Sequence, residues 1–175
     1  MSLRAIAVFL FILLSFRFAS SASPTAETPK SDVKVIIAVR EYLRESKKNP
    51  IQVVIENTSD NPQAHFDEWN SWGYYNLTLA WTDRKGNTGV VEKVPNNWDK
   101  NAASTTILKP GDALVREISF DSVWKGWPDD LTDVTIQAVY QSKVRKDDLP
   151  MFARERVTPW IGTARSKAQA VSIQR

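Results

Sequence analysis

Apolar and polar residues alternate along several short stretches of the chain, and a period of two is typical of β-strands that bury one face. The alternation is clearest at residues 33–39, 51–55, 75–81 and 134–140. Shorter or weaker runs lie at residues 90–91, 105–108, 114–120 and 171–173. No long stretch shows the helical period of about 3.6 residues. The pattern therefore predicts an all-β chain of seven to nine strands.

Turn-forming residues separate these stretches. The segment Asp83–Asn87 contains a glycine directly after the strand that ends near Trp81, which is typical of a hairpin. In Lys109–Asp112, a proline fixes φ and the next residue, a glycine, accepts a positive φ, which favours a tight turn. In the strand that follows, Arg116 falls on the apolar face. We expect it at a sheet edge, with its charge carried out to water.

Many short strands without helices long enough to cross between them favour one antiparallel β-sandwich. The chain resembles small secreted bacterial proteins with a single immunoglobulin-like or fibronectin-III-like sandwich. Three segments carry this resemblance: Val54–Ser59, Leu108–Asp112 and Val134–Tyr140. The Cys–Trp–Cys spacing of antibody domains is absent, because the chain has no cysteine. The resemblance implies the fold and a binding or structural role, and it brings no catalytic residues with it.

The start of the chain has the three parts of a secretory signal peptide. Arg4 gives a positive start, residues 5–16 form an apolar run, and small residues suited to cleavage follow. We expect residues 1–22 to be removed; the alternative is an uncleaved signal anchor. Residues 23–31 would then be a flexible leader, and residues 32–175 the sandwich domain. The expected location is secreted or periplasmic, with no membrane segment after cleavage.

Charge and composition exclude several classes of function. The chain has 23 Lys and Arg against 20 Asp and Glu. Two of the arginines precede the cleavage site, so the remainder has 21 basic and 20 acidic side chains. This balance gives no basic footprint for nucleic acid. With no Cys and a single His, thiol chemistry and ordinary zinc sites are excluded, and we expect no metal and no cofactor.

Motifs for catalysis are also absent. The chain contains no glycine-rich phosphate loop and no Gly-x-Ser-x-Gly motif of serine hydrolases. We therefore expect no catalytic residues and no enzymatic activity. A pair of carboxylates, as in glycosidases, stays open because nothing in the sequence marks two of the 20 acidic residues.

Aromatic residues are the most unusual feature, because the chain has seven Trp and crowds several aromatics into His65–Tyr75. This segment lies in a long connection between predicted strands, where sandwiches often carry binding loops. Trp and Tyr present flat faces that stack on sugar rings or peptide backbones. The candidate ligand-binding residues are Trp69, Trp72, Tyr74 and Trp98. Alternatively, these side chains fold back and close the open end of the core.

The sequence thus favours a secreted, non-enzymatic binding module with polysaccharide as the leading ligand class. The alternative is a protein-interaction or structural module, such as a protease-inhibitor-like sandwich that binds another extracytoplasmic protein. In that case the basic segment Lys143–Arg156 would be presented to a protease. The chain also has N-glycosylation sequons at Asn57 and Asn76. The alternation places Asn76 opposite the apolar face of its strand, where we expect water.

Overall fold

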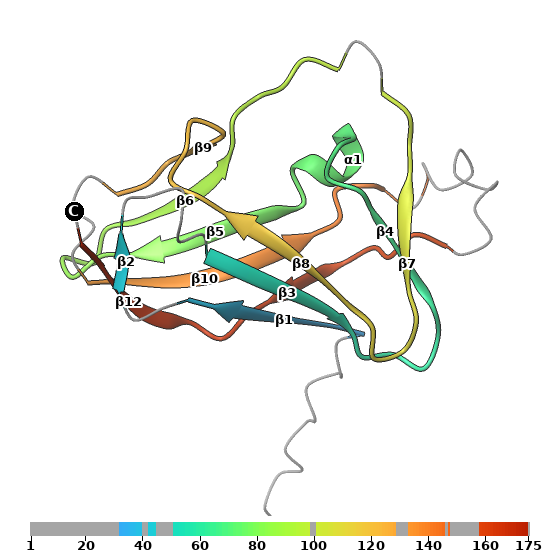
Figure 1. Cartoon of the computed structure of the whole chain (residues 1–175), viewed down its shortest axis with the longest axis horizontal. Helices are drawn as coiled ribbons and strands as arrows, with labels where there is room; N and C mark the ends of the chain where they lie inside the picture. The colour runs from blue at the N-terminus through green and yellow to red at the C-terminus, as the bar shows by residue number, and fades with distance from the viewer. Residues whose placement is uncertain are drawn as a thin grey trace, which may run out of the picture. The chain divides into compact units, whose positions relative to one another are not determined.

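Figure 1 shows the computed structural model of the chain, which describes residues 32–39, 42–44, 51–98, 101–128, 133–145, 147 and 158–174. The predicted signal peptide (1–22) and the predicted leader (23–31) lie outside the described residues. All the described residues belong to one compact unit. The elements described within it are strands and one short helix, so the chain is all-β, as the alternation predicts.

The described residues form twelve strands, which are β1 (Val33–Ala38), β2 (Tyr42–Arg44), β3 (Ile51–Asn57), β4 (Gln63–Phe66), β5 (Leu77–Thr82), β6 (Thr88–Lys93), β7 (Thr105–Leu108), β8 (Ala113–Ile118), β9 (Trp124–Lys125), β10 (Val134–Gln141), β11 (Thr163–Arg165) and β12 (Gln169–Gln174). The helix α1 (Ser71–Tyr74) is a single turn. The alternation predicts eight of these strands. It misses β2, β4, β9 and β11, each of which has only two to four residues.

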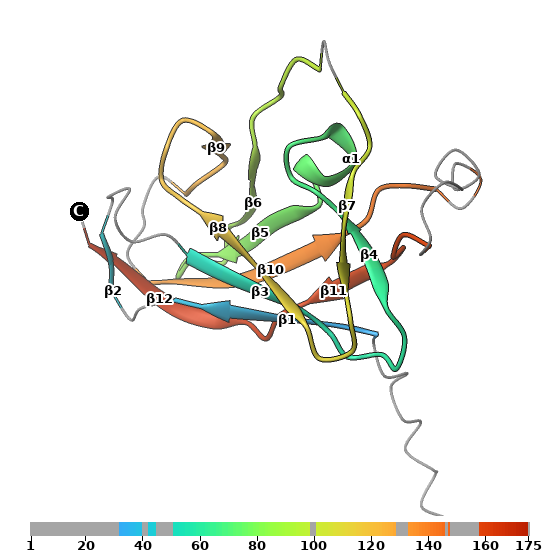
Figure 2. The same cartoon turned by 45° about the vertical axis from the view of Figure 1, so that its right-hand side comes forward.

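Two sheets form the layers of the sandwich (Figures 1 and 2). One has the strand order β1-β3-β8, and the other has the order β2-β12-β10-β5-β6-β9, with β11 also paired to β10. The pairs are antiparallel except for β2, which runs parallel to β12. This arrangement confirms the antiparallel β-sandwich expected from the sequence.

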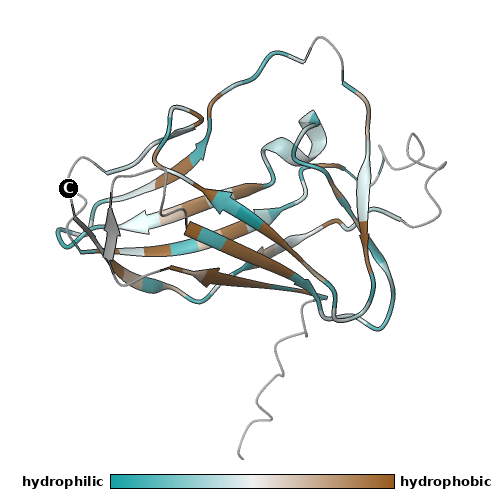
Figure 3. Cartoon of the chain, viewed as in Figure 1, coloured by the Kyte–Doolittle hydropathy of each residue, from teal (hydrophilic) through white to brown (hydrophobic). Residues whose placement is uncertain are grey.

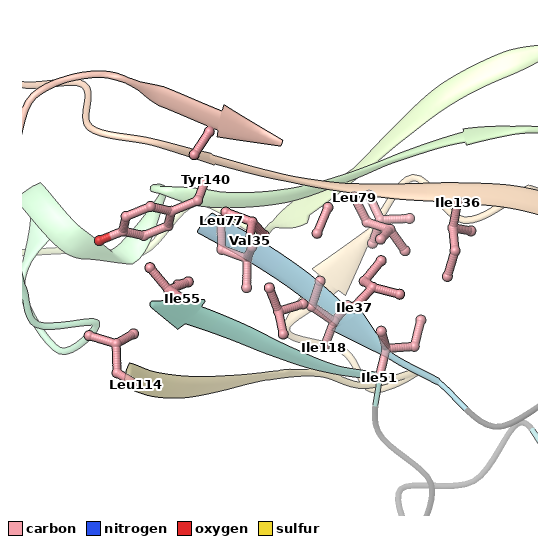
Figure 4. Packing of buried hydrophobic residues seen from close by; sticks show 14 of the residues in the cluster. Val35, Ile37, Ile51, Ile55, Leu77, Leu79, Leu114, Ile118, Ile136 and Tyr140 are labelled. Atoms are coloured by element: carbon pink, nitrogen blue, oxygen red, sulfur yellow. The ribbon is translucent and has the colours of Figure 1, made fainter. Parts of the chain in front are cut away.

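The core lies between the two sheets. In β1, the buried side chains of Val33, Val35 and Ile37 alternate with exposed ones. Figure 3 shows the apolar residues recurring along β1 and β3, and Figure 4 shows Ile55 on one sheet and Leu79 on the other pointing into the same interior. Each fully buried aliphatic side chain of this kind contributes about 1.5–3 kcal/mol. One-sided burial is therefore what produces the period of two in the sequence.

The turn chemistry is also as predicted. Between β5 and β6, the Asp83 carboxylate accepts the backbone N–H groups of Lys85 and Asn87, each at 2.8 Å. Gly86 has φ +84°, a conformation that suits glycine. The turn between β7 and β8 places Gly111 at φ +82°. Both turns connect strands in the order that the sequence indicates.

A small two-stranded sheet, β4–β7, is the main feature that the sequence does not predict. All four residues of β4 are buried, so they show no alternation. β7 pairs with one edge of β4, and Ala64 forms a bridge to Pro159. The Trp160 N–H donates to the Ala64 carbonyl at 2.8 Å. Figures 1 and 2 show this sheet on the same side of the sandwich as α1, so it carries the predicted binding segment.

Candidate functional site

The aromatic segment leaves β4 through a turn that is fixed to the start of β7. The Asp67 carboxylate accepts hydrogen bonds from the Thr106 hydroxyl, at 2.7 Å, and from the Ser104 hydroxyl. The Asp67 N–H donates to the Ser104 carbonyl at 3.1 Å. This part of the predicted loop is therefore held by both side-chain and main-chain hydrogen bonds.

The turn continues into α1 through a buried cap. The Asn70 side chain is 0% exposed, and its Oδ1 accepts the N–H groups of Trp72 (3.1 Å) and Gly73 (3.0 Å). Asn is a preferred residue at this position because its short side chain satisfies the first helical N–H groups. The Asn70 Nδ2 donates to the Ser104 carbonyl at 3.1 Å. From Asp67 to α1 the backbone is thus held by both side-chain and main-chain hydrogen bonds.

Trp69 lies on this supported turn and points away from the core. Its side chain is 59% exposed, although both neighbours in the chain make hydrogen bonds or ion pairs. A large exposed indole on a fixed backbone loses little conformational freedom when a ligand stacks on it. Of the four candidate residues, Trp69 is the one that offers most of its ring to solvent.

Tyr74 and Trp98 contact each other although they are far apart in the sequence. Their ring centroids are 5.2 Å apart with the planes at 78°, and Tyr75 packs edge-on against Tyr74 at 4.8 Å. The three rings are half-buried, and Asn96 donates its N–H to the Tyr75 hydroxyl at 3.1 Å. We call Tyr74, Tyr75 and Trp98 the aromatic patch. The exposed residues Asn96 and Asn97 border it in the chain.

Trp72 has a different environment from the other three candidates. It is half-buried and stacks on Phe66, with the centroids 6.4 Å apart. Together with Val144 and Ala103, these residues form a second, small apolar cluster. The structure thus brings Tyr74 and Trp98 together, leaves Trp69 exposed on its turn, and places Trp72 in packing.

An ion cluster that the sequence does not predict lies beneath the aromatic patch. The Glu68 carboxylate is 2.8 Å from the Lys93 Nζ and 3.3 Å from the Arg116 Nε. Lys93 is only 9% exposed, and its ammonium lies 4.5 Å from the Tyr74 ring centroid and 5.4 Å from that of Trp124. Cation–π contacts of this kind stabilise a charge that has lost water.

Arg116 corrects one expectation from the sequence. β8 lies at a sheet edge, as expected, but the guanidinium does not extend into water. Its side chain is only 18% exposed and pairs with Glu68. Arg116 and Lys93 both occupy inward positions of an alternating strand. A cation at an inward position of a strand needs an anion close to it. The pattern at Lys93 and Arg116 therefore could have indicated a buried acidic partner, which is Glu68.

His65, the single histidine, is buried in an aromatic stack. It is 1% exposed, its Nδ1 is 3.2 Å from the Tyr140 hydroxyl, and Trp160 stacks on it at 5.7 Å. Burial, with a further contribution from the charge of Arg116, lowers the pKa of His65 to about 4. Burial raises the pKa of Tyr140 to about 12. Both groups are therefore neutral near pH 7 and serve the packing of β4 on β10.

The two sequons have buried asparagines. Asn57 is 0% exposed and donates through Nδ2 to the carbonyls of Asn61 (2.8 Å) and Leu108 (2.9 Å). Asn76 is 3% exposed, so the expectation of a wet position is wrong. β5 begins only at Leu77, and the Asn76 carbonyl accepts the Gln141 N–H at 2.8 Å. In the folded protein neither side chain is available to a glycan.

Comparisons with known proteins do not assign a family. No protein-family model matches the chain, and no curated protein sequence matches it significantly. In the part of the chain that the structure describes, no three His, Asp or Glu residues are grouped so that they could hold a metal ion. No helix among the same residues has the length and apolar character needed to cross a membrane.

Proposed function

We propose that the protein is a secreted, non-enzymatic binding module that recognises polysaccharide through Trp69 and the aromatic patch. The observation that carries this proposal is the 59% exposure of the Trp69 side chain on a turn fixed by Asp67 and Asn70. An exposed indole costs solubility and contributes little to the core. On a turn held in this way, a ligand can cover the ring at a low cost in conformational freedom.

The chemistry around the turn suits a sugar polymer. Tyr74 and Trp98 are half-buried, with ring planes at 78° to each other, and Lys93 occupies one face of the Tyr74 ring. Stacking on exposed aromatic faces is a common way to hold pyranose rings. The exposed amides of Asn96 and Asn97 both donate and accept hydrogen bonds, as sugar hydroxyls require. Lys143 lies over the Tyr75 ring at 5.7 Å and adds a cation at the border of the patch. An extended or anionic glycan fits this combination best.

A pull-down on insoluble polysaccharides tests the proposal directly. The purified protein is incubated with a panel of neutral and anionic polymers, and tryptophan fluorescence is followed as soluble fragments of each are added. We expect saturable binding with a shifted emission maximum, and we expect Trp69→Ala to lose binding by about tenfold or more. One stacking contact of about 1.4 kcal/mol corresponds to that factor.

Val115→Ala is the matched control, because Val115 is 53% exposed on β8 and is not part of the aromatic patch. It should bind as the wild type does. Absence of binding to every polymer, or full binding by Trp69→Ala, would contradict the proposal. The alternative protease-inhibitor-like role stays a prediction, because residues 146 and 148–156 of its loop lie outside the described residues.

A further inference from the structure

An apolar groove runs along the outer edge of β1 and shares no lining residue with the aromatic patch. Its volume is about 590 Å³. Residues 34–37 of β1 form one wall, and Arg165, Lys167, Ala168 and Gln169 form the other. β1 packs against β11, and Figure 2 shows both of them near β12. The groove therefore lies where an edge of one sheet meets an edge of the other.

The groove exists because the β11–β12 segment is interrupted. β11 pairs with residues 139–141 of β10 and β12 with residues 134–136, which leaves a gap at Gln137 and Ala138. Ser166 fills that gap, since its Oγ accepts the Ala138 N–H and its own N–H donates to the Ala138 carbonyl, both at 2.9 Å. Residues 167 and 168 are then outside the β10 ladder, which resumes at Gln169 where β12 begins.

The β1 side of the groove offers main-chain hydrogen bonds. Among the described strands β1 pairs only with β3. Because the Thr58 N–H donates to the Asp32 carbonyl, alternation along the ladder directs the main-chain groups of Val35 and Ile37 away from β3. A sheet edge of this kind is a template for an added strand, and charges along it disfavour strands of like charge.

The charges around the groove select the occupant. Lys34, Arg165 and Lys167 all line it, and none of the described lining residues is acidic. Lys34 also pairs with Glu56 at 3.4 Å, whereas Arg165 and Lys167 are exposed. A second copy of this chain would bring the same cations together. An acidic strand is attracted to them instead.

We propose that this groove binds an extended segment of another protein, added as a strand to β1, with apolar residues at alternate positions and acidic residues at its ends. The alternate apolar side chains would enter the groove, as in β-strand addition generally. The acidic ends would pair with Arg165 and Lys167. This inference goes beyond polysaccharide binding and does not depend on it.

The test uses three labelled nine-residue peptides and fluorescence anisotropy with the purified protein. The first has Val or Ile at alternate central positions and Glu at both ends, the second replaces Glu by Lys, and the third places Pro at the centre. We expect the Glu peptide to bind at least about tenfold more tightly than the Lys peptide. The Pro peptide should not bind, because it lacks a central N–H.

Two variants locate the binding. Ala168→Trp fills the groove from an exposed position and should abolish binding, while Arg165→Glu combined with Lys167→Glu should reverse the preference to the Lys peptide. Lys85→Glu, at the exposed β5–β6 turn, is the charge control and should change nothing. Circular dichroism melting checks that each variant is folded. Amide exchange should slow at Val35 and Ile37 when the Glu peptide is added.

Several outcomes would overturn the proposal. They are failure of the Glu peptide to bind, equal binding of the Glu and Lys peptides, and unchanged binding by folded Ala168→Trp. Protection of the β1 amides that rises with protein concentration in the absence of peptide would show instead that a second copy covers this edge. Sedimentation velocity on the same samples would then detect the dimer.

Discussion

The Nδ1 atom of His65 lies 3.2 Å from the hydroxyl oxygen of Tyr140, and the Trp160 ring stacks on both residues. His65 belongs to β4 and Tyr140 to β10, so this contact joins the small sheet to the main sandwich. Both side chains are almost fully buried. A neutral imidazole fits this environment, whereas a charged one would have to lose its water without an acidic partner.

The burial of His65 makes the stability of the protein depend on pH. In the unfolded chain its pKa is near 6.5, and in the folded protein it is about 4. Between these values the unfolded state binds more protons, so stability is complete above pH 6.5 and falls as the pH drops towards 4. The full loss is about 3 kcal/mol. Urea unfolding at intervals from pH 7.5 to pH 4 measures it.

His65→Gln is the control for this titration, because glutamine can keep a hydrogen bond to Tyr140 and does not titrate. It should be less stable than wild type at pH 7 but should show a shallower dependence on pH. Equal slopes for the two proteins would mean that other groups cause the acid loss of stability.

Glu68 holds the ion cluster together, so its removal should be costly. Glu68→Gln leaves the cations of Lys93 and Arg116 facing each other without an anion, and Lys93 is only 9% exposed. Because Glu68 itself is partly exposed, we expect a loss of about 2 kcal/mol, less than for a fully buried pair. Equilibrium urea unfolding of the variant gives the value.

The matched control is Glu92→Gln, since Glu92 pairs with Lys125 at 3.4 Å where both side chains are about half exposed. Such a surface pair contributes at most about 1 kcal/mol. If the two variants lost the same stability, the buried position of Lys93 would have no energetic consequence. The double variant Glu68→Gln with Lys93→Met should recover part of the loss, because it removes one unpaired cation.

Asn57 connects three parts of the chain through its side chain. Its Nδ2 donates to the Asn61 and Leu108 carbonyls, and its Oδ1 accepts the Ser59 N–H at 3.0 Å. Asn57→Ala leaves the buried Leu108 carbonyl without this donor and removes the partly buried hydrogen bonds to Asn61 and Ser59, so it should cost about 2–4 kcal/mol. Asn61→Ala, at an exposed site where only the main chain takes part, should cost less than about 0.5 kcal/mol. Thermal unfolding of both variants compares them, and equal losses would contradict the role of Asn57.

The sequence predicts the strands that bury one face and fails where both faces are covered. Residues 33–38 and 134–138 alternate because the core covers one side and solvent the other. β4 cannot show this pattern, since His65 and its neighbours are all buried. β4 contacts β7 and Pro159, which come from distant parts of the chain, so its burial does not appear as an alternation in the local sequence.

The candidate site is predictable only in part for a similar reason. The clustering of aromatics in His65–Tyr75 is a property of the sequence, but the direction of each ring depends on the Asn70 cap. That cap turns Trp72 onto Phe66 while Trp69 stays exposed. No periodicity distinguishes the two tryptophans, because the turn between them is neither strand nor a full helix.

Trp69 and Trp72 should therefore respond differently to truncation. Trp72→Ala removes a half-buried ring from the small apolar cluster, and we expect a loss of about 2 kcal/mol, below the 3–5 kcal/mol of a fully buried ring. Trp69→Ala should change stability by less than about 0.5 kcal/mol. Paired urea titrations measure both. A large loss for Trp69→Ala would show that this ring stabilises the fold and is not held for a ligand.

The conformation of the turn depends on a glycine that has no room for a side chain. Gly73 is buried in α1, and a Cβ there would collide with the main-chain carbonyl oxygens of Asp67 and Phe66. Those atoms cannot retreat without breaking the hydrogen bond from the Asp67 N–H to the Ser104 carbonyl. We therefore expect Gly73→Ala to cost about 2–3 kcal/mol and to weaken polysaccharide binding together with stability.

Gly86→Ala separates this crowding from the general effect of replacing glycine. Gly86 has φ +84° and open space around it, so alanine there should cost only the strain of that conformation, about 1–2 kcal/mol, without altering polysaccharide binding. Urea unfolding and the polysaccharide pull-down are carried out on both variants. If Gly73→Ala retained wild-type stability and binding, the turn would tolerate movement of its backbone. Trp69 would then not be held on a rigid turn before the ligand binds.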